Sequence, residues 1–150
     1  MAPSKKIVHV HLGSDNYKTT LTAGNHEIIA DEPTSVGGQD AGPDPYDLLL
    51  MSLGTCTAMT LRMYAARKEW PLEDIYVELR HFKDHADDCE DCDEKKGAKI
   101  DQIEKEIVVK GELDDDQVQR LLEIAEKCPV NRTLKSTIEM RSAIEKHPKA

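Results

Sequence analysis

The pattern of hydrophobic and polar positions divides this chain into short alternating segments and one long apolar segment. Alternation over Ile7–Leu12, Tyr17–Leu21 and His26–Ala30, with turn residues between them, predicts an antiparallel three-stranded meander. Two further alternating segments, Ile75–Phe82 and Ile100–Val109, predict a pair of strands later in the chain. We expect these strands to be half-exposed, because polar side chains occupy alternate positions and therefore share one face.

The long apolar segment predicts a helix from Pro45 to about Lys68. Asp44 suits the N-cap position and Pro45 the first helical position, while Trp70 and Pro71 end the helix. Apolar residues cover nearly its whole circumference, which is typical of a buried helix. A chain of 150 residues can bury such a helix only beneath a sheet, against a partner chain, or both.

The C-terminal part predicts two shorter helices and a last strand. Val118–Ala125 is amphipathic and follows the acidic run Asp114–Asp116, which favours a helix N-terminus. Cys128–Leu134 predicts a second short helix, and Thr137–Met140 a strand. The order βββ-α-ββ-αα-β indicates an α+β fold, and we expect residues 1–150 to form a single domain.

Composition and charge exclude several classes of function. The net charge of −9 argues against binding to nucleic acids or anionic membranes, which requires clustered positive charge. Residues 1–6 lack the apolar segment of a signal peptide, and no apolar run reaches the roughly 18 residues of a transmembrane helix. We therefore expect a cytoplasmic protein whose four cysteines serve thiol or metal chemistry rather than structural disulfides.

Two of the cysteines lie in predicted helices. Cys56 falls in the middle of the long helix, where it is either a small core residue or a reactive thiol. Cys128 precedes Pro129, so its sulfur would lie near the free N–H groups of a helix N-terminus, which favour a thiolate. Arg132 could reach the same sulfur; the alternative is an ordinary helix junction with Arg132 in solvent.

The other two cysteines lie in an acidic segment. His81, His85, Cys89 and Cys92 fall within twelve residues, and imidazole and thiolate are ligands that Zn²⁺ prefers. The segment could hold zinc at Cys89 and Cys92, it could provide a redox dithiol, or it could be the exposed acidic tip of a hairpin. The glycine-rich stretch 37–43 lacks the lysine and spacing of a phosphate-binding loop, so nucleotide binding is not expected.

Two motifs together resemble one protein family. Gly42–Tyr64 resembles the central helix of the OsmC/Ohr family, the osmotically inducible and organic hydroperoxide resistance proteins, and Lys127–Leu134 is similar to the family's second cysteine motif. The order of strands and helices fits over about residues 7–141. The resemblance implies an intertwined homodimer in which antiparallel sheets wrap around buried central helices.

The resemblance also implies an activity, the thiol-dependent reduction of organic hydroperoxides in oxidative-stress defence, with no required cofactor. By motif match, Cys56 attacks the peroxide and becomes a sulfenic acid, Cys128 condenses with it to a Cys56–Cys128 disulfide, and a dithiol reductant reduces that disulfide. Two alternatives are a non-enzymatic redox or metal sensor that uses Cys89 and Cys92, and a small-ligand-binding dimer without peroxidase activity.

Further site residues follow from the same resemblance. In the peroxidase members of the family, an Arg and a Glu assist the attacking cysteine. The position of the Glu corresponds to Tyr46, next to Asp47, and Lys18 is the cation nearest the position of the Arg. Arg62 and Arg132 are the other cations that could serve in its place.

Overall fold

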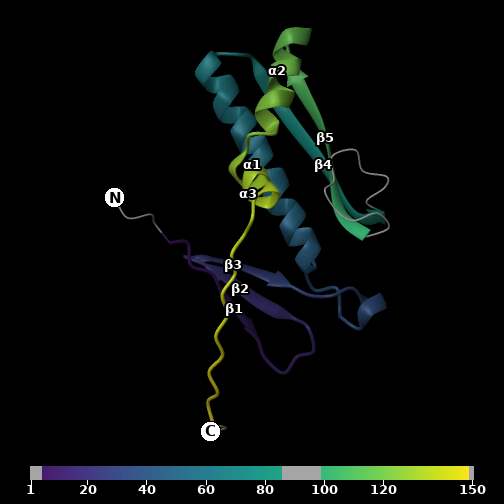
Figure 1. Ribbon diagram of the computed structural model, residues 1–150, viewed down its shortest axis with the longest axis vertical. Helices are drawn as coiled ribbons and strands as arrows, with labels where there is room; N and C mark the ends of the chain where they lie inside the picture. Colours follow the sequence, from purple (N-terminus) through teal and green to yellow (C-terminus); the bar gives the residue numbers. More distant parts are fainter. Residues whose placement is uncertain (1–4, 86–98, 149–150) are drawn as a thin grey trace. The chain divides into compact units, whose positions relative to one another are not determined.

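The computed structural model describes residues 5–148 with the exception of 86–98 (Figure 1). Helices and strands follow one another in the predicted α+β order, apart from the last strand. The elements are β1 (His9–Leu12), β2 (Thr19–Ala23), β3 (His26–Ala30), the 3₁₀ turn η1 (Thr34–Val36), α1 (Pro45–Lys68), β4 (Leu72–His85), β5 (Lys99–Gly111), α2 (Asp115–Ala125) and α3 (Pro129–Lys135).

The chain divides into two units. The first unit comprises Met1–Ser52 and Leu79–Glu104, and the second comprises Leu53–Glu78 and Lys105–Ala150. The boundary passes through α1, β4 and β5, so each of these elements contributes residues to both units.

The first unit contains an antiparallel sheet in the order β1-β2-β3, as the alternating pattern predicts. Val10 pairs with Leu21, and Leu21 pairs with Ile28, so the three side chains form a row on one face. Val10 and Ile28 are 67% and 51% exposed, so this chain leaves part of the apolar row uncovered.

A buried carboxylate organises the loop between β3 and α1. Asp31 is 3% exposed, and this burial by itself raises its pKa. The backbone N–H groups of Ala41, Glu32 and Gln39 donate to the carboxylate at 3.1, 2.8 and 3.2 Å. These hydrogen bonds and the charge of Lys18 outweigh the burial, so the pKa of Asp31 lies below its ordinary value.

The predicted start of α1 is confirmed. The backbone N–H of Asp47 donates to Asp44 Oδ1 at 2.8 Å, and the N–H of Asp44 donates to Asp47 Oδ2 at 3.2 Å. This reciprocal pair satisfies two donors at the helix start, and Pro45 occupies a position that needs no donor. Asp47 therefore has a defined structural role at the start of α1.

By length and composition, α1 could cross a membrane. An 18-residue window within Pro45–Lys68 has a mean hydropathy of 1.2, and 33% of that window is buried within this chain. The sequence expectation rested on unbroken apolar runs, and the scattered Ser and Thr residues of α1 interrupt the run without lowering its mean hydropathy much. The core helices of soluble proteins pass the same test, so it is weak evidence for a membrane span.

The core of the second unit forms where α1 meets α2. Leu61 and Ala65 of α1 pack with Leu121 and Ala125 of α2, and all four are at most 2% exposed. Tyr64, Leu72 and Ile124 complete the buried cluster. The remaining surface of α1 is more open, since three of its methionines are more than half exposed. These are Met51, Met59 and Met63.

Two sequence predictions need correction. The strands predicted at Ile75–Phe82 and Ile100–Val109 are longer, and form the two-stranded sheet β4-β5. Thr137–Met140 has no regular structure, and Met140 is 80% exposed. A strand requires a neighbouring strand to satisfy its backbone groups, and among the described residues none pairs with this segment.

Candidate functional site

The second unit brings Cys56 and Cys128 to the same turn of helix. The backbone N–H of Val130 donates to Cys56 Sγ at 3.5 Å, and the N–H of the next residue, Asn131, donates to Cys128 Sγ at 3.3 Å. Both distances are within the range of hydrogen bonds to sulfur. Two cysteines separated by 71 residues in sequence thus accept hydrogen bonds from consecutive amides at the start of α3.

The N-terminus of α3 is built as the sequence predicts. Cys128 is the N-cap residue, with extended backbone dihedrals (φ −62°, ψ 143°), and Pro129 follows it in the first turn. The Cys128 side chain takes the role in which Ser or Asp is usual, because its sulfur accepts the Asn131 N–H. Cys128 is completely buried, whereas Cys56 is partly exposed.

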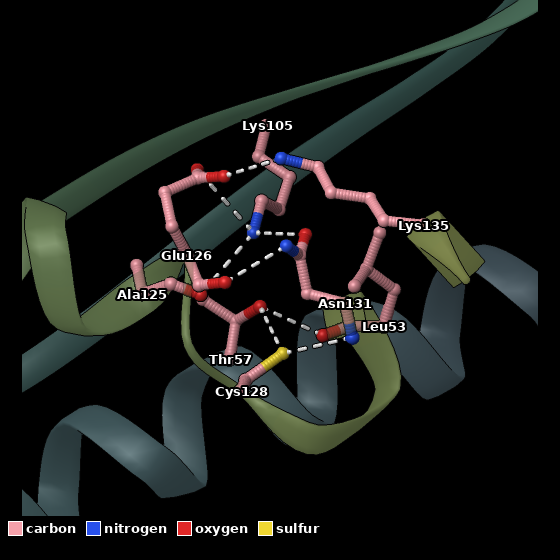
Figure 2. Close-up of polar contacts among 8 residues, drawn as sticks. All are labelled: Leu53, Thr57, Lys105, Ala125, Glu126, Cys128, Asn131 and Lys135. Atoms are coloured by element: carbon pink, nitrogen blue, oxygen red, sulfur yellow. Dashed lines mark hydrogen bonds and ion pairs between the residues drawn. The ribbon is translucent and has the colours of Figure 1, made fainter. Parts of the chain in front are cut away.

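Thr57 directly follows Cys56 in sequence, but its hydroxyl contacts the sulfur of Cys128. Its hydroxyl donates to the Leu53 carbonyl at 2.9 Å and lies 3.6 Å from Cys128 Sγ (Figure 2). A hydroxyl has one proton to donate, and here Leu53 receives it. The Cys128 S–H group is therefore the donor to Thr57, so the thiol form of Cys128 has both a donor and an acceptor partner.

Lys105 contacts three residues close to Cys128 in sequence. Lys105 Nζ, from β5, donates to Asn131 Oδ1 at 3.0 Å and to the Ala125 carbonyl at 3.5 Å, and it lies 3.8 Å from Glu126 Oε1 (Figure 2). The Asn131 side-chain amide in turn donates to the Glu126 carbonyl at 2.9 Å. This network joins β5, the end of α2 and the start of α3 around Cys128.

In the part of the chain that the structure describes, the two candidate arginines do not make the predicted contacts with the sulfurs. The Arg62 guanidinium donates to the backbone carbonyls of Leu72 and Glu73, the latter at 2.7 Å, and so fixes the start of β4. Arg132 is exposed. Within residues 5–85 and 99–148, no hydrogen bond or ion pair joins either arginine to Cys56 or Cys128.

Other candidates lie in the first unit. Tyr46 stacks on His81, with ring centroids 4.5 Å apart and the planes at 13°. His81 Nε2 lies 2.8 Å from Asp101 Oδ1, so a carboxylate holds this ring in place. Lys18 acts on Asp31 by its charge. These contacts show what Tyr46, His81 and Lys18 do in the fold and leave their predicted catalytic or metal-binding roles untested.

The predicted zinc ligands are only partly described. His85 ends β4, whereas Cys89 and Cys92 lie outside the described residues. In the described part of the chain, no group of three or more His, Cys, Asp or Glu side chains is arranged to hold a metal ion. The zinc and dithiol hypotheses for Cys89 and Cys92 remain predictions.

A cavity of about 310 Å³ begins one helical turn after Cys56. Thr60 and Met63 line it, and they follow Cys56 at the i+4 and i+7 spacing that shares one face of α1. The other lining residues are Tyr64, Arg67, Ile124 and Lys127. The cavity thus combines apolar side chains with two cations, in the same unit as both thiols.

Tyr64 lines this cavity and has a charged partner. The Arg120 Nε donates to its hydroxyl at 3.1 Å, and this hydrogen bond lowers the pKa of Tyr64. The same hydrogen bond, together with that to Glu123 at 2.7 Å, raises the pKa of Arg120. These two partners stabilise the charged form of Arg120.

Sequence reasoning missed Thr57, Lys105 and Asn131 as neighbours of the thiols. Asn131 carried a signal, because the third helical residue is the one whose N–H an N-cap side chain accepts. Thr57 also carried one, since it adjoins Cys56 in the cysteine motif. Lys105 carried none, because it lies in an alternating strand in which every second residue is polar.

The fold and the cysteine motifs identify the class of protein. The sequence model of the OsmC-like protein family matches residues 37–142, which include both Cys56 and Cys128. The chain belongs to the OsmC-like protein family. This confirms the family resemblance and, with the arrangement of helices and antiparallel sheets, the predicted fold class.

Solved structures share this fold. An OsmC-like protein from Mycoplasma pneumoniae is similar with a TM-score of 0.69 at 16% identity, over 88% of each chain. The organic hydroperoxide resistance protein OsmC from Legionella pneumophila has a TM-score of 0.63 at 20% identity, over 90% of this chain and 92% of that one. An organic hydroperoxide resistance protein from Elizabethkingia anophelis has a TM-score of 0.65 at 17% identity, over 92% of this chain and 93% of that one. A search of curated proteins finds no match.

Proposed function

We propose that this chain is a thiol-dependent peroxidase that reduces organic hydroperoxides. The observation that carries the proposal is the pair of hydrogen bonds from consecutive α3 amides, which bring Cys56 and Cys128 together. Family membership adds support, since two proteins of the same fold are described as organic hydroperoxide resistance proteins. Both lines favour a peroxide-related redox role.

The reaction has two steps at sulfur. In the first, the Cys56 thiolate attacks one peroxide oxygen, the O–O bond breaks, and an alcohol leaves once its oxygen is protonated; Cys56 becomes a sulfenic acid. In the second, Cys128 sulfur attacks Cys56 sulfur, the S–S bond forms, and the hydroxyl leaves as water with the Cys128 proton. A dithiol then reduces the disulfide and is itself oxidised.

Exposure supports the assignment of the two roles. Cys56 is partly exposed, so a peroxide can approach its sulfur, and the cavity that begins at Thr60 offers a place for the organic part of the substrate. Cys128 is completely buried, and its S–H is paired with Thr57. Although the residues alone favour Cys128 as the thiolate, accessibility favours Cys56 as the attacking group.

Thiol titration by mass spectrometry tests this function. Reduced protein is mixed with one equivalent of cumene hydroperoxide, and the expected result is a Cys56–Cys128 disulfide with loss of two hydrogen atoms per chain. Cys56→Ser should abolish turnover. Cys128→Ser should leave a Cys56 sulfenic acid that dimedone traps. If Cys56 and Cys128 stay reduced at stoichiometric peroxide, the proposal is wrong.

Replacement of the other two cysteines provides the matched control. A Cys89→Ser, Cys92→Ser double variant should keep full peroxide turnover, because the proposed chemistry uses neither thiol. Loss of the peroxide response in this variant, with Cys56 and Cys128 intact, would favour the sensor alternative. If peroxide oxidises none of the four thiols, the result would instead favour a ligand-binding protein without peroxidase activity.

We also propose that the chain works as a homodimer. The support is apolar surface that one chain leaves uncovered: the row Val10–Leu21–Ile28 of the first sheet, and Met59 and Met63 on α1. Burial of such side chains contributes favourably at about 25 cal/mol per Å² of apolar area. Light scattering coupled to size-exclusion chromatography should give twice the 16.8 kDa chain mass, and a concentration-independent monomer would contradict the proposal.

A further inference from the structure

We propose that Lys105 is a positioning residue that sets Cys128 for the disulfide-forming step. The inference rests on the proposed peroxidase function and goes beyond its two cysteines. Lys105 lies on β5, 23 positions before Cys128 in sequence, and contacts neither sulfur. Its influence on the reaction passes through the groups that it does contact, and Asn131 is the one whose backbone N–H donates to the Cys128 sulfur.

The burial of Lys105 separates it from an ordinary surface lysine. Its side chain is 9% exposed, whereas the side chain of Lys135 is 71% exposed. Both lysines pair with Glu126, at 3.8 Å and 3.3 Å. A buried ammonium loses hydration that only protein groups can replace, so such a group is costly unless it is hydrogen-bonded. Here Asn131 Oδ1 and the Ala125 carbonyl supply the hydrogen bonds.

The contacts run in a continuous path from the ammonium to the sulfur. Lys105 Nζ donates to Asn131 Oδ1 at 3.0 Å, which fixes the orientation of the side-chain amide (Figure 2). That amide donates to the Glu126 carbonyl at 2.9 Å and so ties α3 to the end of α2. The Asn131 backbone N–H then donates to Cys128 Sγ at 3.3 Å. Lys105 thus fixes the residue that holds the sulfur.

The two reaction steps depend on this path differently. Attack on the peroxide uses Cys56, whose sulfur accepts from Val130 and has no direct contact with the network. Disulfide formation needs Cys128 Sγ aligned with Cys56 Sγ, and a misplacement of about 1 Å can cost about 100-fold in rate. Loss of the ammonium should therefore slow the second step and leave the first unchanged. A general loss of structure would slow both.

A comparison of two lysine variants tests the proposal. Lys105→Met keeps the length of the stem and removes the ammonium, and Lys135→Met removes the exposed ammonium that shares Glu126. Stopped-flow measurements with cumene hydroperoxide follow sulfenic acid formation and then disulfide formation. We expect Lys105→Met to form the disulfide at least tenfold more slowly with unchanged sulfenic acid formation, and Lys135→Met to match the wild type in both steps.

Two further variants distinguish positioning from simple destabilisation. Lys105→Arg retains a cation that can donate to Asn131 Oδ1 and should recover most of the second-step rate. Asn131→Leu removes that acceptor but keeps the backbone N–H, and it should slow the second step as Lys105→Met does. This variant keeps the proposal testable should Lys105→Met fail to fold.

The outcomes distinguish a failure of the Lys105 role from a failure of the peroxidase function. If the wild type forms the disulfide and both Lys105→Met and Asn131→Leu form it equally fast, the role of Lys105 is wrong and the proposed function stands. If Lys105→Met slows both steps to the same extent, positioning is also wrong. If the wild type forms no Cys56–Cys128 disulfide with peroxide, the proposed function fails, and the role of Lys105 fails with it.

Discussion

Replacement of Leu61 tests the packing that holds α1 in place beside the thiols. Leu61 is 0% exposed and belongs to the buried cluster between α1 and α2. It also lines a cavity of about 160 Å³, which Leu122 of α2 lines as well, although Leu122 is 51% exposed. The two leucines therefore offer the same change, leucine to alanine, in a buried and an exposed position of one site.

The expected cost of Leu61→Ala has two parts. Three buried carbon atoms are lost, at about 0.8 kcal/mol each, which gives about 2.4 kcal/mol. The vacated space, at most about 75 Å³, adds up to about 1.8 kcal/mol at roughly 24 cal/mol per Å³ of cavity that the surrounding helices leave open. We expect Leu61→Ala to lower the free energy of unfolding by about 2.4–4 kcal/mol, and Leu122→Ala by less than about 1 kcal/mol.

Urea unfolding followed by far-UV circular dichroism measures both costs at one protomer concentration, so that any association contributes equally. The slope of free energy against urea should be unchanged between wild type and variants. A loss below about 1.5 kcal/mol for Leu61→Ala would refute the packing described for α1 and α2. An equal loss for Leu122→Ala would mean that a partner chain buries this leucine, which the single chain leaves exposed.

Two further predictions concern the first unit. A Cβ at Gly42 would lie 2.0 Å from the Ile29 carbonyl oxygen, so Gly42→Ala should cost about 1–3 kcal/mol in urea unfolding, whereas Gly13→Ala, where the nearest atom is 3.8 Å away, should be neutral. The lowered pKa of Asp31 means that the stability from this carboxylate is fully present above about pH 4 and is lost as pH falls through the folded-state pKa. The urea midpoints of wild type and Asp31→Asn should therefore converge below about pH 4, and a constant difference down to about pH 2.5 would contradict this assignment.

The sequence predicted the elements that follow from local pattern. The start of α1 at Pro45 and the N-cap role of Cys128 match the structure, because capping depends on residues within one turn. The predicted strand at Thr137–Met140 is wrong, because alternation shows that a segment can be a strand and does not show that it has a partner. The full burial expected for α1 is likewise not reached within this chain, where its methionines are more than half exposed.

Some features of the candidate site could likewise be predicted from the sequence, and others could not. The proximity of Cys56 and Cys128 could be inferred only from a family resemblance, since 71 residues separate them in sequence. The neighbours of Cys128 were harder to find: Lys105 reaches it from a strand, through Asn131, and no spacing rule links a strand lysine to a helix cap. Conversely, Arg62 was a plausible cation for the attacking cysteine, but its guanidinium donates to backbone carbonyls of β4 instead.

At the first turn of α3, two backbone N–H groups are available to the sulfurs. Pro129 contributes no N–H, the Cys128 N–H donates to Ala125, and Arg132 begins the regular helical hydrogen bonds by donating to Cys128. The N–H groups of Val130 and Asn131 remain, and each binds one sulfur. In the reduced chain, donors and sulfur acceptors at this turn are thus equal in number. Any chemistry that removes a sulfur from its place leaves an amide that must find water or another acceptor.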